Sequence, residues 1–292
     1  MSNSPYKSRF RYASLTYPQT GFGIDVQGKL SLAKIGHLKM MQHRPTEGVV
    51  KTCSIVRHAT GKWFVSFSCD EVDPQVLPPS DQQVGVDVGL KTFAFLSTGE
   101  QIDSPRFFRE EEKQLAKAQR RLSTAAKGSP ERRKRRKIVA RVHERIRWRR
   151  ENFVQQEVLR LVKRFGLIAV ESLAVRSMVK RPKPKRDEVT GQYVPNGASS
   201  EAGLNKSIAD AAWSAFFTAL VAKAEEAERH VVKVPPAYTT QACNDCGHRH
   251  VMPLSVRVYQ CEQCGGVRDR DHNASLNILQ TALGRQSVAL GT

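Results

Sequence analysis

Four of the six cysteines form two Cys-x-x-Cys pairs that are separated by fourteen residues: Cys243, Cys246, Cys261 and Cys264. A glycine follows each pair, Gly247 and Gly265, and allows the left-handed turn that such a pair needs. Two thiolates three positions apart can hold one edge of a tetrahedral Zn²⁺ ion, and the second pair supplies the other edge. The pattern predicts a closed, structural zinc site, with a redox motif or chance pairing as the alternatives. Cys53 and Cys69 lie singly in strand-like segments, and we expect both to be buried.

Three carboxylates stand where a charge is unusual. Asp87 interrupts the apolar run VGVDVGL, Glu171 ends the apolar run LIAVES, and Asp271 lies near the start of the last helical segment. Burying an unpaired carboxylate costs several kcal/mol, roughly, so each needs a partner. Carboxylates that converge from separate segments can bind divalent metal ions against a phosphate. Each also has a simpler explanation: Asp87 pairs with Lys91 or an arginine, Glu171 is the first polar residue after a strand, and Asp271 is a helix cap.

The segments that must position these acids alternate between strand and helix patterns. We expect strands at 84–90 and 93–96, helices at 109–123 and 129–165, a strand at 166–172, a helix at 205–230, a strand at 231–236 and a last helix at about 273–283. Ser129 is the expected N-cap of the second helix and Pro130 its first residue. This order predicts an α/β fold, a mixed sheet with helices on both faces.

The remaining segments are shorter and more polar. Residues 22–72 are expected to form short β-strands, with a turn at Thr60 to Lys62. Residues 73–83 are rich in proline and polar residues and indicate a linker. Residues 178–203, which contain KRPKPKR, are expected to form a long flexible loop near the site.

The net charge of the 292-residue chain is +19, from 47 lysines and arginines against 28 acidic residues. A polyanionic partner, nucleic acid, is the simplest explanation. We expect no membrane association, because the chain has no apolar run of 18 residues and no basic amphipathic helix with a broad apolar face. The first eighteen residues contain no apolar core of a signal peptide, so an intracellular, cytoplasmic protein is expected.

Between Lys127 and Arg150 there are twelve lysines and arginines and only two glutamates. The predicted nucleic-acid-binding residues are Arg132, Arg133, Lys134, Arg135, Arg136, Lys137, Arg141 and Arg145. An apolar stripe at Ile138, Val142 and Ile146 allows one side of this helix to pack while the rest faces phosphates. A solvated helix with excess charge is the alternative. The aromatic residues Trp148, Trp213, Phe216 and Phe217 are expected in the core instead of stacking on bases.

Three runs of the sequence resemble the motifs of one family: GVDVGLKTFAFLSTG, IAVESLAV, and CNDCGHRH with YQCEQCGGVRDRDHNASLNIL. In this order they are similar to the three RuvC motifs and the zinc ribbon of the TnpB/OrfB insertion-sequence proteins, relatives of type V CRISPR effectors. The resemblance implies an RNase H-like (RuvC) fold and RNA-guided cleavage of DNA. It further implies that Asp87, Glu171 and Asp271 bind two Mg²⁺ ions. Asp269 competes for the third position, but Asp271 matches the family pattern of an acid before x-Asn-Ala.

The resemblance also implies a domain organisation. We expect a partial β-barrel at 1–78, a RuvC-like domain at 84–240 with a basic helical hairpin at 109–165, a zinc ribbon at 241–267, and the last RuvC motif at 268–292. The family generally has a longer N-terminal part, so the resemblance marks this chain as N-terminally short. Two other functions remain open: a nucleic-acid-binding module that does not cut, and a transposase that performs strand transfer.

Overall fold

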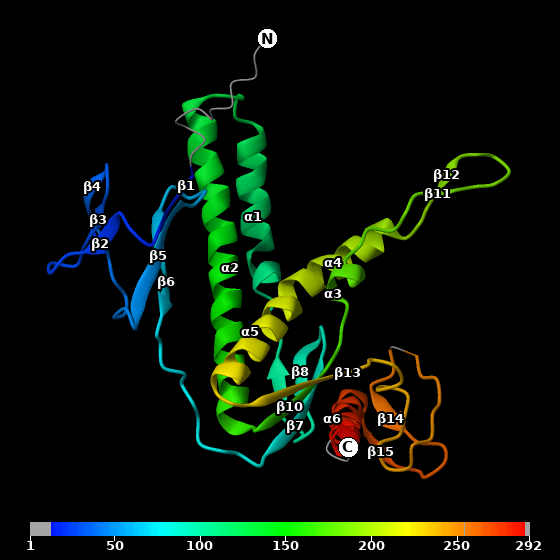
Figure 1. Ribbon diagram of the computed structural model, residues 1–292. Helices are drawn as coiled ribbons and strands as arrows, with labels where there is room; N and C mark the ends of the chain where they lie inside the picture. Colours follow the sequence, from blue (N-terminus) through cyan, green and yellow to red (C-terminus); the bar gives the residue numbers. More distant parts are fainter. Residues whose placement is uncertain (1–12, 254, 290–292) are drawn as a thin grey trace. The chain divides into compact units, whose positions relative to one another are not determined.

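The computed structural model describes residues 13–253 and 255–289 (Figure 1). The chain forms two compact units. One comprises Met1–Pro74 and Gln114–Glu144, and the other Gln75–Lys113 and Arg145–Thr292. The start of the chain, residues 1–12, on which the expectation of no signal peptide partly depends, lies outside the described residues. Among the residues described, no helix has both the length and the apolar character to cross a membrane.

The second unit is built on a five-stranded sheet. Its strands are β7 (Gln83–Val88), β8 (Thr92–Leu96), β9 (Gln101–Asp103), β10 (Leu167–Glu171) and β13 (His230–Val234). They lie in the order β13-β10-β7-β8-β9. Strand β10 is parallel to both β7 and β13, whereas β8 is antiparallel to β7 and to β9. The mixed sheet that the sequence predicts is confirmed.

Helices cover both faces of this sheet (Figure 1). On one face, Val86 and Val170 pack against the C-terminal half of α2 (Pro130–Arg164) and against α5 (Trp213–Glu226). On the other face, Ala169 packs against Ile278 of α6 (Arg270–Ala289). Side chains alternate between the faces along a strand, so the continuous apolar runs reflect burial on both sides.

Helix α6 lies unusually close to β7, and glycine makes this possible. A Cβ atom on Gly85 would lie 2.0 Å from the carbonyl oxygen of Ser275 and 2.9 Å from the backbone nitrogen of Leu279. Both atoms belong to the backbone of α6, so no side-chain rotation could relieve the clash. Gly85 pairs with Ala169 on β10, another small residue of the same face. This strip of small residues sets the separation of sheet and helix.

The first unit contains two three-stranded antiparallel sheets. One has the order β1-β5-β6 and the other β2-β3-β4. Their bounds are β1 (Ser14–Pro18), β2 (Phe22–Ile24), β3 (Lys29–Leu32), β4 (Gly36–Lys39), β5 (Val49–Arg57) and β6 (Trp63–Asp70). Leu30 and Leu32 share a core with Cys53 and Ile55. Cys53 is buried as expected, but Cys69 is exposed, so the expectation of burial is wrong for Cys69.

The long helices begin and end close to where their caps predict. Helix α1 spans Phe107–Ser123, and α2 begins at Pro130, where the backbone N–H of Arg132 donates to the Ser129 hydroxyl at 3.0 Å. Val142 and Ile146 of the predicted stripe are buried, but Ile138 is exposed. Trp213 and Phe216 are core residues, whereas Trp148 is 40% exposed, so its expected place in the core is wrong.

Three further segments differ from the expectation. Residues 178–203 are not a continuous loop, because they include the end of α3 (Val175–Met178), the hairpin of β11 (Lys185–Arg186) and β12 (Tyr193–Val194), and the start of α4. The helix expected at 205–230 is divided into α4 (Ala198–Ala211) and α5 by Ala212, whose φ is 55°. The last helix starts three residues earlier than expected, at Arg270. Neither glycine nor proline marks the break at Ala212, so the sequence contains no signal for it.

Candidate acid site and metal centre

Asp87 and Glu171 lie side by side at the ends of two parallel strands. Val86 of β7 pairs with Val170 of β10, and the two acids are the next residues along each strand. Gly85 and Ala169, two positions earlier, lie on the face covered by α6. Because side chains two apart on a strand share a face, both carboxylates also lie on the α6 face.

The N-terminus of α6 brings two more acids to this edge, with different roles. The Asp269 carboxylate accepts hydrogen bonds from the backbone N–H groups of Asp271 (2.8 Å) and His272 (3.2 Å), which makes it the cap of the helix. The Asp271 carboxylate is 3.2 Å from the guanidinium of Arg257 and 3.6 Å from that of Arg270. Asp271 is therefore held by side chains and Asp269 by the backbone.

The charges of these acids act on one another, although among the described residues only the four cysteines form a group whose ligand atoms are close enough to share one metal ion. Burial raises the pKa of Asp87 well above its usual value, and the charges of Glu171 and Asp271 raise it further, while Arg270 lowers it. Burial also raises the pKa of Glu171. Among the described residues Lys91 forms no ion pair, so it does not neutralise Asp87. Half-buried carboxylates that repel one another are donors that a hard divalent cation would stabilise.

Glu171 is oriented by a residue that the sequence analysis did not single out. The hydroxyl of Thr239 donates to Glu171 Oε1 at 2.5 Å and opposes the effect of burial on the pKa of Glu171. The carbonyl of Thr239 accepts a hydrogen bond from the buried amide of Asn277 in α6 at 2.8 Å. Thr239 therefore links the acid of β10 to the helix that carries Asp271. The sequence offers one signal for this contact: Asn277 is a polar amide among the apolar residues of the run NASLNIL, and such an amide needs a hydrogen-bond partner when it is buried.

The cysteine insert is anchored to the same helix. Asn273 and Asn277 of α6 both donate to the carbonyl of Ala242, each at 2.7 Å. The backbone N–H of Asn244 donates to Asn273 Oδ1 at 3.0 Å. Asn273 is fully buried, so these bonds satisfy polar groups that would otherwise be costly. The first cysteine pair is thus fixed to the N-terminal half of α6.

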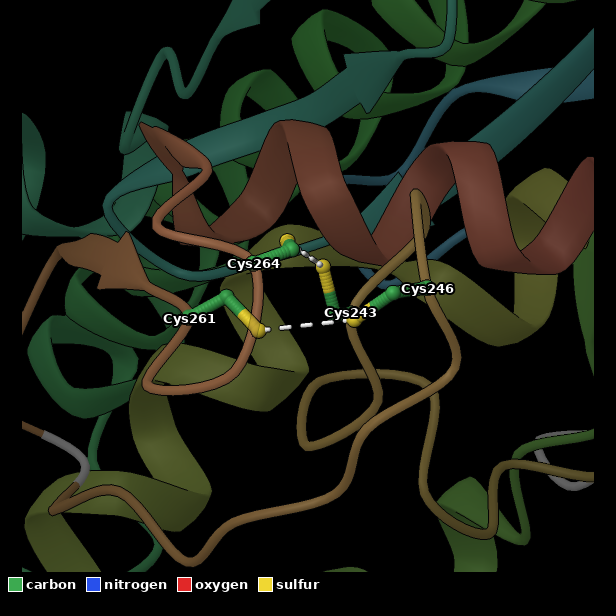
Figure 2. Close-up of side chains that lie close together, drawn as sticks. All are labelled: Cys243, Cys246, Cys261 and Cys264. Atoms are coloured by element: carbon green, nitrogen blue, oxygen red, sulfur yellow. Dashed lines mark hydrogen bonds between the residues drawn. The ribbon is translucent and has the colours of Figure 1, made fainter.

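The four cysteines of the insert point toward one another (Figure 2), with ligand atoms that all lie within 4.8 Å. The Sγ atoms of Cys243 and Cys264 are 3.7 Å apart, and those of Cys246 and Cys261 are 3.6 Å apart. Tetrahedral zinc with Zn–S bonds of about 2.3 Å places its sulfur atoms roughly 3.8 Å apart. The spacing fits a metal ion of this kind.

Local backbone geometry prepares the two turns for a metal ion. Gly247 and Gly265 have φ of 75° and 73°, the left-handed region that favours glycine. Their N–H groups donate to the carbonyls of Cys243 and Cys261 at 2.9 and 3.0 Å. Backbone N–H groups of Cys264 and Gln263 help to lower the pKa of Cys261 to about 6, whereas burial and the neighbouring thiols raise the pKa of Cys246 and of Cys264. A lowered thiol pKa favours the thiolate that binds metal. Strands β14 (Val258–Gln260) and β15 (Val267–Asp269) pair beside the second turn.

The eight basic residues predicted to bind nucleic acid divide into three groups. Arg132 and Arg135 donate to carbonyls at the C-terminal end of α1, so they serve to cap that helix. Arg145 is 3.2 Å from Glu111. The other five are exposed and, among the described residues, form no ion pair: Arg133, Lys134, Arg136, Lys137 and Arg141. We call these five the basic face of α2.

The fold and these clusters together define a strongly basic α/β protein with acids at the carboxyl ends of two parallel strands and four cysteines placed so that they could hold one metal ion. Residues 66–182 match the family OrfB_IS605, described as "Probable transposase", and residues 213–278 match the Cas12f1-like TNB domain.

Two relatives match nearly the whole chain. A "Putative RNA-guided DNA endonuclease" of Streptomyces pristinaespiralis is 35% identical over 98% of this chain and 67% of its own length. InsQ of Escherichia coli K12, named in the same way, is 31% identical over 98% of this chain and 69% of its own. The chain therefore belongs to the TnpB/OrfB family of insertion-sequence proteins.

The fold has a counterpart among solved structures. A chain in the cryo-EM structure of a Cas12f1-sgRNA-target DNA complex matches 78% of this chain and 45% of its own, with a TM-score of 0.50 and 17% identity. At that identity the likeness concerns the fold alone. It agrees with a mixed α/β arrangement.

Proposed function

We propose that this protein is a metal-dependent DNA endonuclease of the TnpB/OrfB type, directed by a guide RNA, with an RNase H-like (RuvC) core. In this proposal Asp87, Glu171 and Asp271 hold Mg²⁺. The observation that carries it is the placement of the three acids: adjacent ends of two parallel strands, one shared face, and the first turn of α6 over that face. As they stand, their oxygen atoms are not among the described groups close enough to share one ion, so in this proposal the side chains close on the metal when it binds.

The donor set suits magnesium, which prefers carboxylate oxygens and retains several waters. When bound, two such ions supply an activated water and stabilise the leaving oxygen of a phosphodiester. The side chains have their own roles. Asp87 must lose its proton before it can bind a cation, because burial and its acidic neighbours favour the neutral form. Thr239 fixes one oxygen of Glu171 and leaves the other available.

A surface pocket of about 290 Å³ opens at the end of β10 and is lined by Glu171, Arg176, Phe217 and Lys233. Lys233 pairs with Val170, so this pocket lies on the sheet face that α5 covers, opposite the face of the acids. Its two basic side chains suit a phosphate backbone that passes the end of β10.

Other parts of the chain fit the same function. We propose that the four cysteines hold one structural zinc ion, because the sulfur spacing suits it and all four ligands are protein groups. The basic face of α2 is proposed to contact the phosphates of nucleic acid. The names of the relatives, RNA-guided DNA endonucleases, support DNA as the substrate and RNA as the guide.

A second function, binding without cleavage, is favoured by one observation. Arg257 pairs with Asp271, and Asp87 favours its protonated form, so the acids are partly neutralised within the protein itself. A site of this kind can bind nucleic acid without holding a catalytic ion. The two functions differ in whether divalent metal binds the acids and whether phosphodiester bonds break.

The test is cleavage of single- and double-stranded DNA by the protein co-purified with RNA from its own locus, with Mg²⁺ and with EDTA. We expect Mg²⁺-dependent cleavage that Asp87→Ala abolishes. Asp187→Ala is the matched control, because Asp187 is a half-buried residue whose carboxylate accepts hydrogen bonds only from its own turn among the described contacts. Binding without cleavage by both the wild type and the control would reject the nuclease and support the binding module. Joined DNA products would point to strand transfer.

A further inference from the structure

A second pocket, of about 410 Å³, adjoins the acid site on the side of Asp271. Four cationic side chains line it: Lys91, Arg106, Arg109 and Arg257. Arg257 is the direct connection, because its guanidinium lies 3.2 Å from the Asp271 carboxylate. These cations come from the β7–β8 turn, the segment before α1, α1 itself and the cysteine insert. All of these segments belong to the second unit.

The charge of this pocket is strongly positive. Asp210, its one acidic lining residue, already has partners. Its carboxylate forms an ion pair with Arg150 at 2.8 Å and accepts a hydrogen bond from the backbone N–H of Phe108 at 2.9 Å. Arg109 pairs with Glu112. Lys91 and Arg106, by contrast, form no ion pair within the part of the chain that the structure describes. The pocket thus presents two uncompensated cations next to an acid cluster.

The backbone holds both of these cations in defined turns. Arg106 has a φ of 48°, an uncommon left-handed conformation for a residue other than glycine. The Arg106 carbonyl accepts a hydrogen bond from the backbone N–H of Glu110, in the first turn of α1, at 3.2 Å. Lys91 lies in a tight turn, where the N–H of Gly89 donates to the carbonyl of Phe93 at 3.0 Å. Backbone strain of this kind is concentrated at functional sites.

We propose that this pocket binds a backbone phosphate of the DNA strand that lies across the acid site, through Lys91 and Arg106. This inference rests on the proposed function. The pocket would hold the DNA strand next to the acids that cut it. A phosphate is the ligand that suits two cations, Lys91 and Arg106, that have no acidic partner within the described part of the chain. DNA is favoured over the guide because the pocket shares Arg257 with Asp271, and the strand to be cut must lie at that acid.

The experiment measures the binding of a fluorescent single-stranded DNA, and of RNA with the same sequence, by anisotropy in EDTA at several salt concentrations. The variants are Lys91→Ala and Arg106→Gly, because glycine accepts the φ of residue 106 without strain. Lys223→Ala is the control, since it removes a cation of α5 that is not among the lining residues and that pairs with Glu226. Circular dichroism and zinc content establish that each variant is folded.

We expect the variant that carries both Lys91→Ala and Arg106→Gly to bind DNA about tenfold more weakly, as expected for the loss of one charge-assisted phosphate contact. The slope of log K against log salt is expected to fall by about 0.7, the value for one phosphate of a single strand. DNA affinity and slope equal to those of Lys223→Ala would overturn the proposal, and so would a loss that affects RNA but not DNA.

This readout separates the pocket from the nuclease. Binding in EDTA requires no cleavage, so a DNA-binding loss in an inactive protein would retain the pocket and reject the nuclease. Conversely, unchanged DNA binding in a protein that cuts in an Asp87-dependent way would reject the pocket and retain the nuclease.

Discussion

Substitution of Gly85 by alanine tests whether the close approach of α6 assembles the acid site. The new Cβ would lie 2.0 Å from the Ser275 carbonyl oxygen, whereas carbon and oxygen in contact are about 3.3 Å apart. Helix α6 must therefore move by roughly 1.3 Å, the difference between these two distances. Asp271 lies one helical turn before Ser275 and would move with it.

The expected effect has two components. Overpacking costs about 1–3 kcal/mol, and the upper value applies because the obstacle is backbone. For a unit of this size, about 3 kcal/mol lowers Tm by roughly 6–12 °C. A displacement of about 1 Å at a catalytic group costs on the order of a hundredfold in rate. The stabilisation of the protein by Mg²⁺ should also be reduced, because the three acids no longer converge.

Thermal melts of the purified protein with and without Mg²⁺, followed by the cleavage assay, measure both components. Gly203→Ala is the control, because nothing lies within 4 Å of a Cβ at that helical position. It is expected to leave Tm unchanged or to raise it slightly. If Gly85→Ala melts like Gly203→Ala and keeps the full Mg²⁺ shift, the reasoning from the helix–strand contact is wrong.

Four other predictions follow from the contacts described above. The pKa of Asp87 is raised in the folded state, so in EDTA its protonated carboxyl stabilises the fold fully at low pH, and Tm declines as pH rises through that pKa. Asp87→Asn should remove this decline of Tm and abolish the stabilisation by Mg²⁺. Thr239→Val should weaken Mg²⁺ binding about tenfold in a calorimetric titration, while Thr239→Ser should not, because only serine keeps the hydroxyl beside the acid. Cys246→Ser should reduce bound zinc, measured by atomic absorption, from one equivalent to well below one, and expose the insert to protease. Burial tends to raise the pKa of Glu144, but hydrogen bonds from Lys62 and Thr60 hold it below its usual value. Glu144 therefore stabilises the fold above about pH 4.5, and this stabilisation is lost as pH falls through the lowered pKa; Glu144→Gln should cost about 1.5 kcal/mol in urea unfolding at pH 7 and progressively less as pH falls.

Helix α2 shows which surface features could be predicted from the sequence. Its charge excess and its buried positions Val142 and Ile146 could be recognised from the sequence, because helical periodicity is a local property. The separate roles of Arg132 and Arg135 could not, since they depend on where α1 ends in space. The exposure of Trp148 is a similar case, because residue type alone does not decide which side of a helix packs.

At the acid site, the features that the sequence determines are clearly separate from those that only the tertiary structure determines. The sequence by itself determined the cysteine pairs, the strand and helix order, and the presence of carboxylates in apolar runs, because spacing and periodicity act over a few residues. Only the tertiary structure decided that Asp269 caps α6 while Asp271 faces Arg257.

The tertiary structure also decided how Thr239 meets Glu171 and how Gly85 admits α6 against the sheet. These contacts join residues 68 positions apart or more, through strand register and helix packing. No local pattern encodes such distances, because they result from which small residues let two backbones approach and which buried polar groups then find partners.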